Sequence, residues 1–192
     1  NENFDINGYN LTILDKPRIT NNSPSIGYTG NSFTVNITIE EYVDSGEELT
    51  VNVTWSHGDL SEDNESMSFT GGSNLNGFTY EYTISALDLN SIENLSYSIY
   101  VNDTSGNQNN TQYTATVLDD DAPEFSDIIA THPETGESYN FTVNVTDNIA
   151  LSNVYLNTNI SGSWLNHSMN YSSVTEKYWR VISIPATATI LH

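Results

Sequence analysis

The most regular feature of the sequence is a short-range alternation of apolar and polar residues. Residues 33–39 read FTVNITI and residues 49–55 read LTVNVTW, so every second residue is apolar and the residues between them are Asn or Thr. A period of two is typical of a β-strand that buries one face. This alternation, with turn-forming residues between the stretches, predicts strands at 18–21, 33–39, 49–55, 65–69, 78–85, 95–101 and 111–118.

Seven short strands separated by Gly, Ser, Asn and Asp predict an all-β fold made of two packed antiparallel sheets. Seven is the strand number of an immunoglobulin-like sandwich, and Trp55 on the third predicted strand fits the core Trp of such folds. The sequence has no cysteine, so the disulfide that usually lies beside that Trp is absent. Hydrophobic packing alone is expected to hold the two sheets together.

The second half of the chain repeats the pattern of the first. Residues 33–40 (FTVNITIE) resemble residues 141–147 (FTVNVTD), and many residues match others 106 positions later. The offset then falls to 102, where N-E-S-M at 64–67 matches N-H-S-M at 166–169, because a loop between the second and third strands is shorter. We therefore predict tandem copies of one module. The residues matched at the first offset are Pro17, Gly30, Phe33, Val35, Ile37 and Ile39 with Pro123, Gly136, Tyr139, Phe141, Val143 and Val145.

The repeat also predicts the module boundaries. Residues 15–118 form the first Ig-like module and residues 119–192 the second, while residues 1–14 resemble the end of the first module and are interpreted as the last strand of a preceding one. Residues 190–192 correspond to the approach to the sixth strand, so the second module is expected to lack its last two strands in this chain. Two explanations stay open: the chain is a segment of a longer array, or a neighbouring subunit donates the missing strand.

Composition limits the partners. The formal net charge of −21 arises because the chain has only four Lys and Arg residues. Such a surface repels nucleic acid and anionic lipid, and divalent cations are its natural counterions. The longest apolar runs are strand-sized, well short of the roughly twenty residues that span a bilayer, and the first residues lack the pattern of a signal peptide. We therefore expect no nucleic-acid partner and no membrane span in this segment.

Asparagine is common on the outward positions of the predicted strands and often begins an Asn-X-Ser/Thr triplet, the acceptor sequence for N-linked glycans. The chain has thirteen such triplets, about twice the number that chance pairing of its Asn with Ser and Thr would give. A solvent face rich in Asn and Thr produces some triplets by itself, but it does not explain why N-x-S-M recurs at equivalent places. We predict covalent N-glycans, with candidate attachment sites at Asn10, Asn21, Asn36, Asn52, Asn64, Asn94, Asn102, Asn109, Asn140, Asn144, Asn159, Asn166 and Asn170.

Three motifs together resemble a class of surface protein. They are FTVNITI, the turn D-T-S-G-N at 103–107, and the linker TVLDDDAP at 116–123. The combination resembles the tandem Ig-like modules, akin to cadherin and fibronectin-III modules, of large archaeal cell-surface or S-layer-associated glycoproteins. The resemblance implies an extracellular, glycosylated protein with a structural or adhesive role. The chain departs from cadherins because it lacks their full set of acidic motifs.

Acidic residues gather at the predicted junctions between modules. The linker is expected to lie near the loop after the second strand of one module and the loop after the fifth strand of the other. Several carboxylates at one place suit Ca²⁺, which takes about six to eight oxygen ligands, whereas a merely solvated acidic linker is the alternative. The candidate metal ligands are Asp88, Glu93, Asp119, Asp120, Asp121 and Asp147, with Asp15, Glu40, Glu41 and Asp103 as the analogous group at the preceding junction.

Catalytic chemistry finds no support in the sequence. No nucleophile elbow, phosphate loop or dinucleotide fingerprint is present, and no carboxylate pair belongs to a motif. We expect that the chain is not an enzyme and has no catalytic residue. Trp164, Tyr178 and Trp179 could form a sugar-binding platform, although aromatic residues also build sandwich cores. Four histidines without zinc-ligand spacing are interpreted as loop or surface residues: His57, His132, His167 and His192.

These observations predict an extracellular structural protein, in which a rod of glycosylated tandem modules forms part of an S-layer, sheath or filament. Its expected partners are copies of itself or neighbouring surface-protein subunits, with glycans as a further candidate. Two other functions stay open: an adhesin stalk or carbohydrate-binding module, and the non-catalytic flank of a secreted hydrolase. Beyond the covalent glycans, the only cofactor expected is Ca²⁺ at the junctions.

Overall fold

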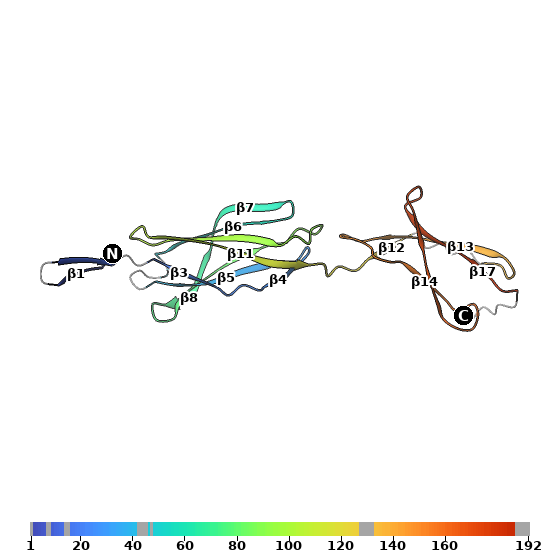
Figure 1. Ribbon diagram of the computed structural model, residues 1–192, viewed down its shortest axis with the longest axis horizontal. Helices are drawn as coiled ribbons and strands as arrows, with labels where there is room; N and C mark the ends of the chain where they lie inside the picture. The colour runs from blue at the N-terminus through green and yellow to red at the C-terminus, as the bar shows by residue number, and fades with distance from the viewer. Residues whose placement is uncertain are drawn as a thin grey trace. The chain divides into compact units, whose positions relative to one another are not determined.

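A computed structural model describes residues 16–41, 46, 48–126 and 133–186, and the backbone of residues 2–6 and 9–13. Every regular element that it describes is a β-strand (Figure 1). The chain divides into two compact units, Asn1–Asp120 and Asp121–His192. This division falls two residues after the predicted boundary between residues 118 and 119.

The first strands form a hairpin of their own. Strand β1 (Glu2–Ile6) pairs antiparallel with β2 (Tyr9–Ile13) in a two-stranded sheet. The sequence predicted one strand in residues 1–14, whereas the structure has two there. Their assignment to a preceding module stays a prediction.

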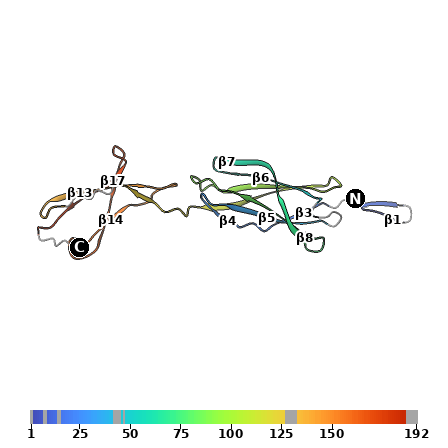
Figure 2. The ribbon, with the colours of Figure 1, turned by 180° about the vertical axis from the view of Figure 1, so that it is seen from behind.

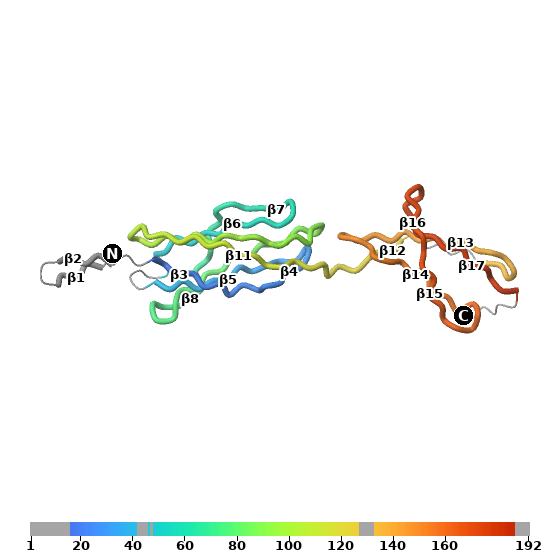
Figure 3. The backbone as a smooth tube through the Cα atoms, viewed as in Figure 1, coloured from blue at the N-terminus to red at the C-terminus, as the bar shows by residue number. Residues whose placement is uncertain are grey.

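One sheet of the first unit has the order β3-β5-β9-β8, and all its neighbours are antiparallel. Three of its strands lie at predicted positions. The long pair β5·β9 forms its centre, and Figures 1 and 3 label β3, β5 and β8 of this sheet. The strands are β3 (Arg18–Asn21), β5 (Phe33–Glu40), β9 (Gly77–Ile84) and β8 (Ser68–Ser73).

The other sheet of the first unit has the order β4-β11-β10-β6-β7 and covers the first (Figure 2). Its pairs are antiparallel except β4 with β11, which run parallel. Strand β7 lies at its edge. The strands are β4 (Ile26–Tyr28), β11 (Gln108–Leu118), β10 (Leu95–Asn102), β6 (Thr50–His57) and β7 (Leu60–Ser66).

This strand order confirms the predicted fold class. When the strands are lettered along the chain from β3, the first sheet has the order A-B-E-D of an immunoglobulin fold. The second sheet has the order G-F-C followed by an added C′ strand, with the short β4 beside G. The fold is therefore an all-β, Ig-like antiparallel sandwich. The first unit has nine strands from β3 to β11 rather than the seven predicted.

The predicted strand at 65–69 is wrong, because the chain changes sheets in the middle of it. Strand β7 pairs with β6 in one sheet, whereas β8 pairs with β9 in the other. Between them Met67 is buried, and its backbone N–H donates to the carbonyl oxygen of Val51 over 2.9 Å. A buried apolar anchor with a satisfied N–H lets the chain cross between the layers at a single residue.

The alternation that predicted the strands also fills the core. On β5 the side chains alternate strictly between buried and half-buried from Phe33 to Glu40. Trp55 is buried in the same core, as the sequence predicted, and its Nε1 donates to Glu62 on β7 over 3.1 Å. The core also contains Val35, Ile37, Ile39, Val51, Val53, Phe78, Tyr80, Ile84, Leu87, Leu95, Tyr97, Ile99 and Val101.

The second unit has counterparts of the four-stranded sheet of the first unit and of its C–C′ strand pair, β6 and β7. Its four-stranded sheet has the order β12-β13-β17-β16, which matches β3-β5-β9-β8, and a separate two-stranded sheet pairs β14 with β15. Residues 190–192, on which the expected loss of two strands rested, lie outside the described residues. The strands are β12 (Glu124–Ser126), β13 (Ser138–Thr146), β17 (Lys177–Ser183), β16 (Asn170–Ser172), β14 (Tyr155–Thr158) and β15 (Leu165–Ser168).

Strand register fixes which residues of the two units are equivalent. Ile37 lies opposite Tyr80, and Val143 lies opposite Tyr178, so Ile37 corresponds to Val143 at the predicted offset of 106. At this offset Asn36 corresponds to Thr142 rather than to another asparagine. The likeness of FTVNITIE to FTVNVTD, which is shifted by two further residues, is therefore not a structural equivalence.

A buried carboxylate closes the hairpin between β10 and β11. Asp103 is buried and accepts two hydrogen bonds of 2.7 Å, from the backbone N–H and from the side-chain Nδ2 of Asn107. Gly106 has a φ of 83°, a left-handed conformation that glycine adopts without strain. The D-T-S-G-N motif is therefore a turn built around one aspartate.

Replacing Asp103 with alanine is expected to lower the free energy of unfolding by about 2 kcal/mol, because two charge-assisted hydrogen bonds are lost and Asn107 is left unpaired. Urea unfolding followed by tryptophan fluorescence measures the loss. Gln108→Ala, at an exposed position directly after the same turn, is the control. Equal effects of the two substitutions would show that the aspartate does not hold the turn.

Candidate glycosylation sites

The candidate asparagines differ in whether the side-chain nitrogen is free. N-linked glycans attach to this atom, Nδ2. In four of them Nδ2 donates a hydrogen bond within the fold. The bonds run from Asn21 to Tyr97 Oη (2.9 Å), from Asn36 to Glu81 Oε1 (2.7 Å), from Asn52 to Asn64 Oδ1 (2.9 Å) and from Asn109 to the carbonyl oxygen of Pro17 (2.8 Å).

The bond of Asn36 shows what this first group does. Asn36 on β5 and Glu81 on β9 are directly opposite each other, so their bond links the two central strands of the sheet. Its Oδ1 also accepts a bond from Asn22 over 3.4 Å. This asparagine is half-buried, and its amide belongs to a cross-strand network.

A second group of asparagines is exposed to solvent in the described part of the fold. They lie on different elements: Asn64 on β7, Asn94 before β10, and Asn140, Asn166 and Asn170 on β13, β15 and β16. Three others, Asn102, Asn144 and Asn159, are half-buried. The side chain of Asn10 lies outside the described residues.

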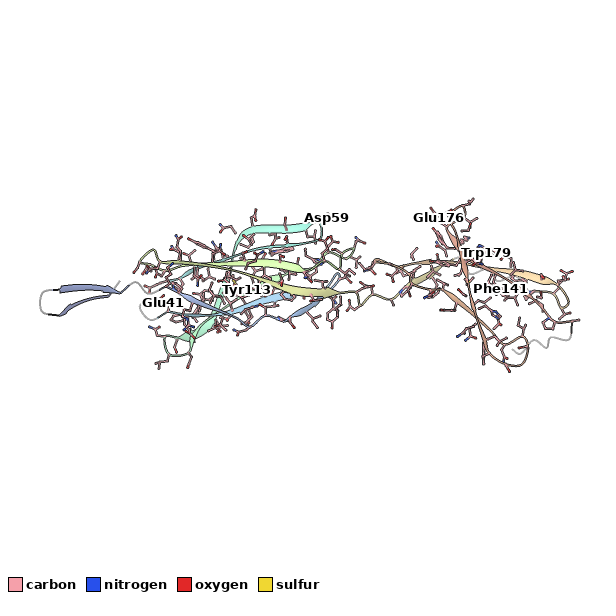
Figure 4. All side chains as sticks on the ribbon, viewed as in Figure 1. Glu41, Asp59, Tyr113, Phe141, Glu176 and Trp179 are labelled. Atoms are coloured by element: carbon pink, nitrogen blue, oxygen red, sulfur yellow. The ribbon has the colours of Figure 1, made fainter. Side chains whose placement is uncertain are left out.

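Of the predicted metal ligands, Asp88 and Glu93 line one polar depression in the first unit, with a volume of about 260 Å³, together with Asp59, Asn90 and Ser91. Figure 4 labels Asp59. The Asp88 carboxylate accepts hydrogen bonds from the backbone N–H of Asp59 and of Asn90, both of 2.9 Å. These two bonds lower the pKa of Asp88. The carboxylate is therefore already used to hold the loop.

The linker aspartates contact their own units. Asn31 donates to Asp120 over 3.0 Å in the first unit, where Thr29 also lies 3.4 Å from Asp119. In the second unit Asn148 donates to Asp121 over 3.2 Å. Asp147 accepts the backbone N–H groups of residues 149 and 150.

At the opposite end of the first unit, Glu40 forms an exposed ion pair with Arg18, and Glu41 and Asp103 are buried. Asp15 lies outside the described residues. Among the residues that the structure describes, no group of three or more His, Cys, Asp or Glu side chains has the geometry to hold a metal ion. The predicted calcium sites combine ligands from two adjacent modules, and they stay a prediction.

Calcium at the junctions predicts a measurable stabilisation. With an affinity typical of extracellular modules, calcium at ten times its Kd raises the free energy of unfolding by about 1.4 kcal/mol. Calorimetric melting in calcium and in chelator tests this, with Asp120→Asn as a variant expected to reduce the difference. Identical melting temperatures in calcium and chelator would contradict a calcium-dependent junction.

The histidines were predicted to lie in loops or at the surface, and the structure describes two of the four. His57 is not a surface residue: it is 1% exposed at the end of β6, and its Nδ1 accepts the backbone N–H of Asp88. His57 follows Val53 and Trp55 at every second residue of β6, so it points to the same buried face. This spacing could have predicted its burial from the sequence. His167 on β15 is half-buried, 3.1 Å from Thr158 Oγ1, while His132 and His192 lie outside the described residues.

The three residues of the predicted sugar platform do not share a surface. Tyr178 packs against the core of the second unit. Trp179, labelled in Figure 4, is the next residue on β17, so strand alternation directs it to the opposite face. Trp164 lies before β15 and is 70% exposed. The ring of Tyr178 instead packs against that of Tyr171, with centroids 5.2 Å apart.

No family model matches the chain, and no curated protein matches it. Among solved structures, the BIgI domain of the beta protein from S. agalactiae is 22% identical over 55% of this chain and all of its own, with a TM-score of 0.34. A marsupial T cell receptor is 10% identical over 88% of this chain and 63% of its own (TM-score 0.40). A superoxide reductase from Ignicoccus hospitalis is 7% identical, covering 54% and 81% (TM-score 0.36). The Ig-like assignment rests on strand order, not on these likenesses.

Proposed function

We propose that this chain is a structural, non-enzymatic component of an extracellular cell surface, in which tandem Ig-like modules carry N-linked glycans within an S-layer, sheath or filament. The observation that carries the proposal is that the candidate asparagines fall into two groups. Some donate hydrogen bonds within the fold, whereas others are exposed on several strands of both units.

The surface composition supports the same function. The chain is strongly acidic, and its four cationic side chains all lie before or in β3 and in β17. Strands whose outward faces consist of Asn, Ser and Thr are well hydrated, and glycans on such faces protect exposed backbone from proteases. The described residues contain no helix that could span a membrane.

Immunolabelling tests the proposal directly. Antibodies raised against the purified chain are applied to intact cells of the source organism and imaged by electron microscopy. A repeating lattice or fibre that carries the label on unpermeabilised cells is the expected result. Label that appears only after the cells are opened would overturn the surface assignment.

A further inference from the structure

One pair of asparagines occupies the same place in both units. Asn64 and Asn166 each stand three residues before a buried methionine, Met67 and Met169, which are 7% and 8% exposed. The backbone N–H of Met169 donates to the carbonyl oxygen of Val154 over 2.9 Å, as that of Met67 does to Val51. The two N-x-S-M motifs therefore share one position in the fold: an exposed asparagine on the C′ strand, followed by the crossing to the other sheet.

Among the candidate asparagines that the structure describes, no other two fall on equivalent positions. At the offset of 106 set by the strand register, Asn36 corresponds to Thr142, and Asn144 corresponds to Thr38. Asn52 corresponds to Tyr155, because each lies opposite the serine of its motif. The pair Asn64 and Asn166 is thus the feature that the two modules have in common.

The backbone around Asn64 presents the side-chain nitrogen to solvent. Asn64 has a φ of 60° at an irregularity in the pairing of β6 with β7, and its backbone N–H donates to Thr54 Oγ1 over 3.1 Å. Its Oδ1 accepts the amide of Asn52, which leaves Nδ2 as the outward atom. Because a glycan attached to Nδ2 keeps the amide oxygen, this bond survives modification.

Both asparagines lie on edge strands. Strand β7 is the edge of its sheet, and every residue of it is exposed. Strand β15 has β14 as its one neighbour among the described strands. An exposed strand edge offers unpaired N–H and C=O groups to other chains, and proteins protect such edges with charge or by covering them.

The two edges differ in charge. Strand β7 (LSEDNES) carries Glu62, Asp63 and Glu65, which repel a second strand, whereas β15 (LNHS) contains no Asp or Glu. Next to β15, Trp164 is strongly exposed, and Leu165 within it is exposed as well. The edge of the second unit therefore depends more on a covering group.

We propose that Asn64 and Asn166 are the glycan attachment sites shared by the two modules, and that the sugar on each covers the C′ edge strand against pairing with another chain. Asn21, Asn36, Asn52 and Asn109 serve the fold and stay unmodified. The inference rests on the part of the proposed function that gives the modules N-linked glycans. It adds which side chains are modified and what the sugar does.

Mass spectrometry of glycopeptides from the native protein, digested with a non-specific protease, tests the sites. We expect sugar on the peptides that contain Asn64 and Asn166 and none on Asn21, Asn36, Asn52 and Asn109. Sugar on other exposed asparagines but not on these two would overturn the inference and leave the proposed function standing. A native protein without any glycan would overturn both.

Variants of the full chain, made in a host that glycosylates it, test the effect of the sugar. Ser66→Ala and Ser168→Ala destroy one acceptor triplet each but keep the asparagine, and each is expected to lower the intact mass by one glycan. Thr111→Ala, which destroys the triplet of Asn109, is the control and should leave the glycan mass unchanged. An unchanged glycan mass in the first two would refute the site assignment.

Sedimentation velocity then measures self-association of the same variants. Ser168→Ala is expected to shift toward larger species than Ser66→Ala, because β15 lacks the charges of β7. Enzymatic or chemical removal of the sugar from the parent chain should produce the same shift. If Ser168→Ala has lost its glycan and sediments like the parent chain, the edge-covering role is wrong.

Discussion

Replacing Tyr97 with alanine is expected to remove about 3–5 kcal/mol from the free energy of unfolding, the cost typical of deleting a buried aromatic ring. Tyr97 on β10 is 2% exposed and contacts two other rings, with centroids 6.2 Å from that of Phe33 and 5.7 Å from that of Tyr113. It therefore joins the two sheets. In an Ig-like sandwich without a disulfide, no covalent bond compensates for the loss of this contact.

The hydroxyl of Tyr97 makes a separate contribution. It accepts the Nδ2 of Asn21 over 2.9 Å, so Tyr97→Phe should cost about 1 kcal/mol by leaving that amide without a partner. Tyr100→Ala, on the same strand but facing the other way and half-exposed, is the matched control for the ring deletion. Urea unfolding gives all three values. If Tyr97→Ala and Tyr100→Ala lose similar stability, Tyr97 does not anchor the core.

Alkaline pH is expected to destabilise the first unit through Tyr80. Burial raises the pKa of Tyr80 to about 12, and its hydroxyl donates to the carbonyl oxygen of Gly46. An unfolded chain gives up the same proton near its ordinary pKa of about 10. Between these values the unfolded state binds fewer protons than the folded state, so stability falls as pH rises, by about 1.4 kcal/mol per pH unit.

Comparison with Tyr80→Phe isolates this effect. The pKa of Tyr113 is raised by burial and that of Tyr82 by its hydrogen bond to Glu62, so the slope of the parent chain has several sources. The stability advantage of the parent chain over Tyr80→Phe should shrink between about pH 10 and 12. Urea unfolding over that range measures it. Parallel curves for the two proteins would show that the proton on Tyr80 does not contribute.

How far the sequence predicted the fold depended on how many faces of a strand are buried. Strands β5, β6 and β10 bury one face, so their alternation placed them within two residues of their true bounds. Strand β7 buries neither face and leaves no such pattern. Strand β4 is three residues long, too short for a period to appear.

The candidate sites were harder to predict, because the state of an asparagine depends on residues far away in the sequence. Asn36 has the outward parity expected of a glycan site, yet Glu81 on β9 takes its amide. Asn21 is held by Tyr97, and nothing near either residue in the sequence signals this bond. The repeated N-x-S-M motif was an exception, because both copies contain the buried methionine that fixes the position of the asparagine. Their equivalence could therefore be recognised from the local sequence alone.

The placement of the cationic side chains has a practical consequence for anyone who looks for this protein in a cell extract. Trypsin cuts after Lys and Arg, and the chain has none between Arg18 on β3 and Lys177 on β17. Complete digestion therefore leaves one very large fragment, from Ile19 to Lys177, which ordinary peptide surveys discard. The region that contains Asn64 and Asn166 is therefore missed by tryptic proteomics, whereas cleavage at its many acidic residues would reveal it.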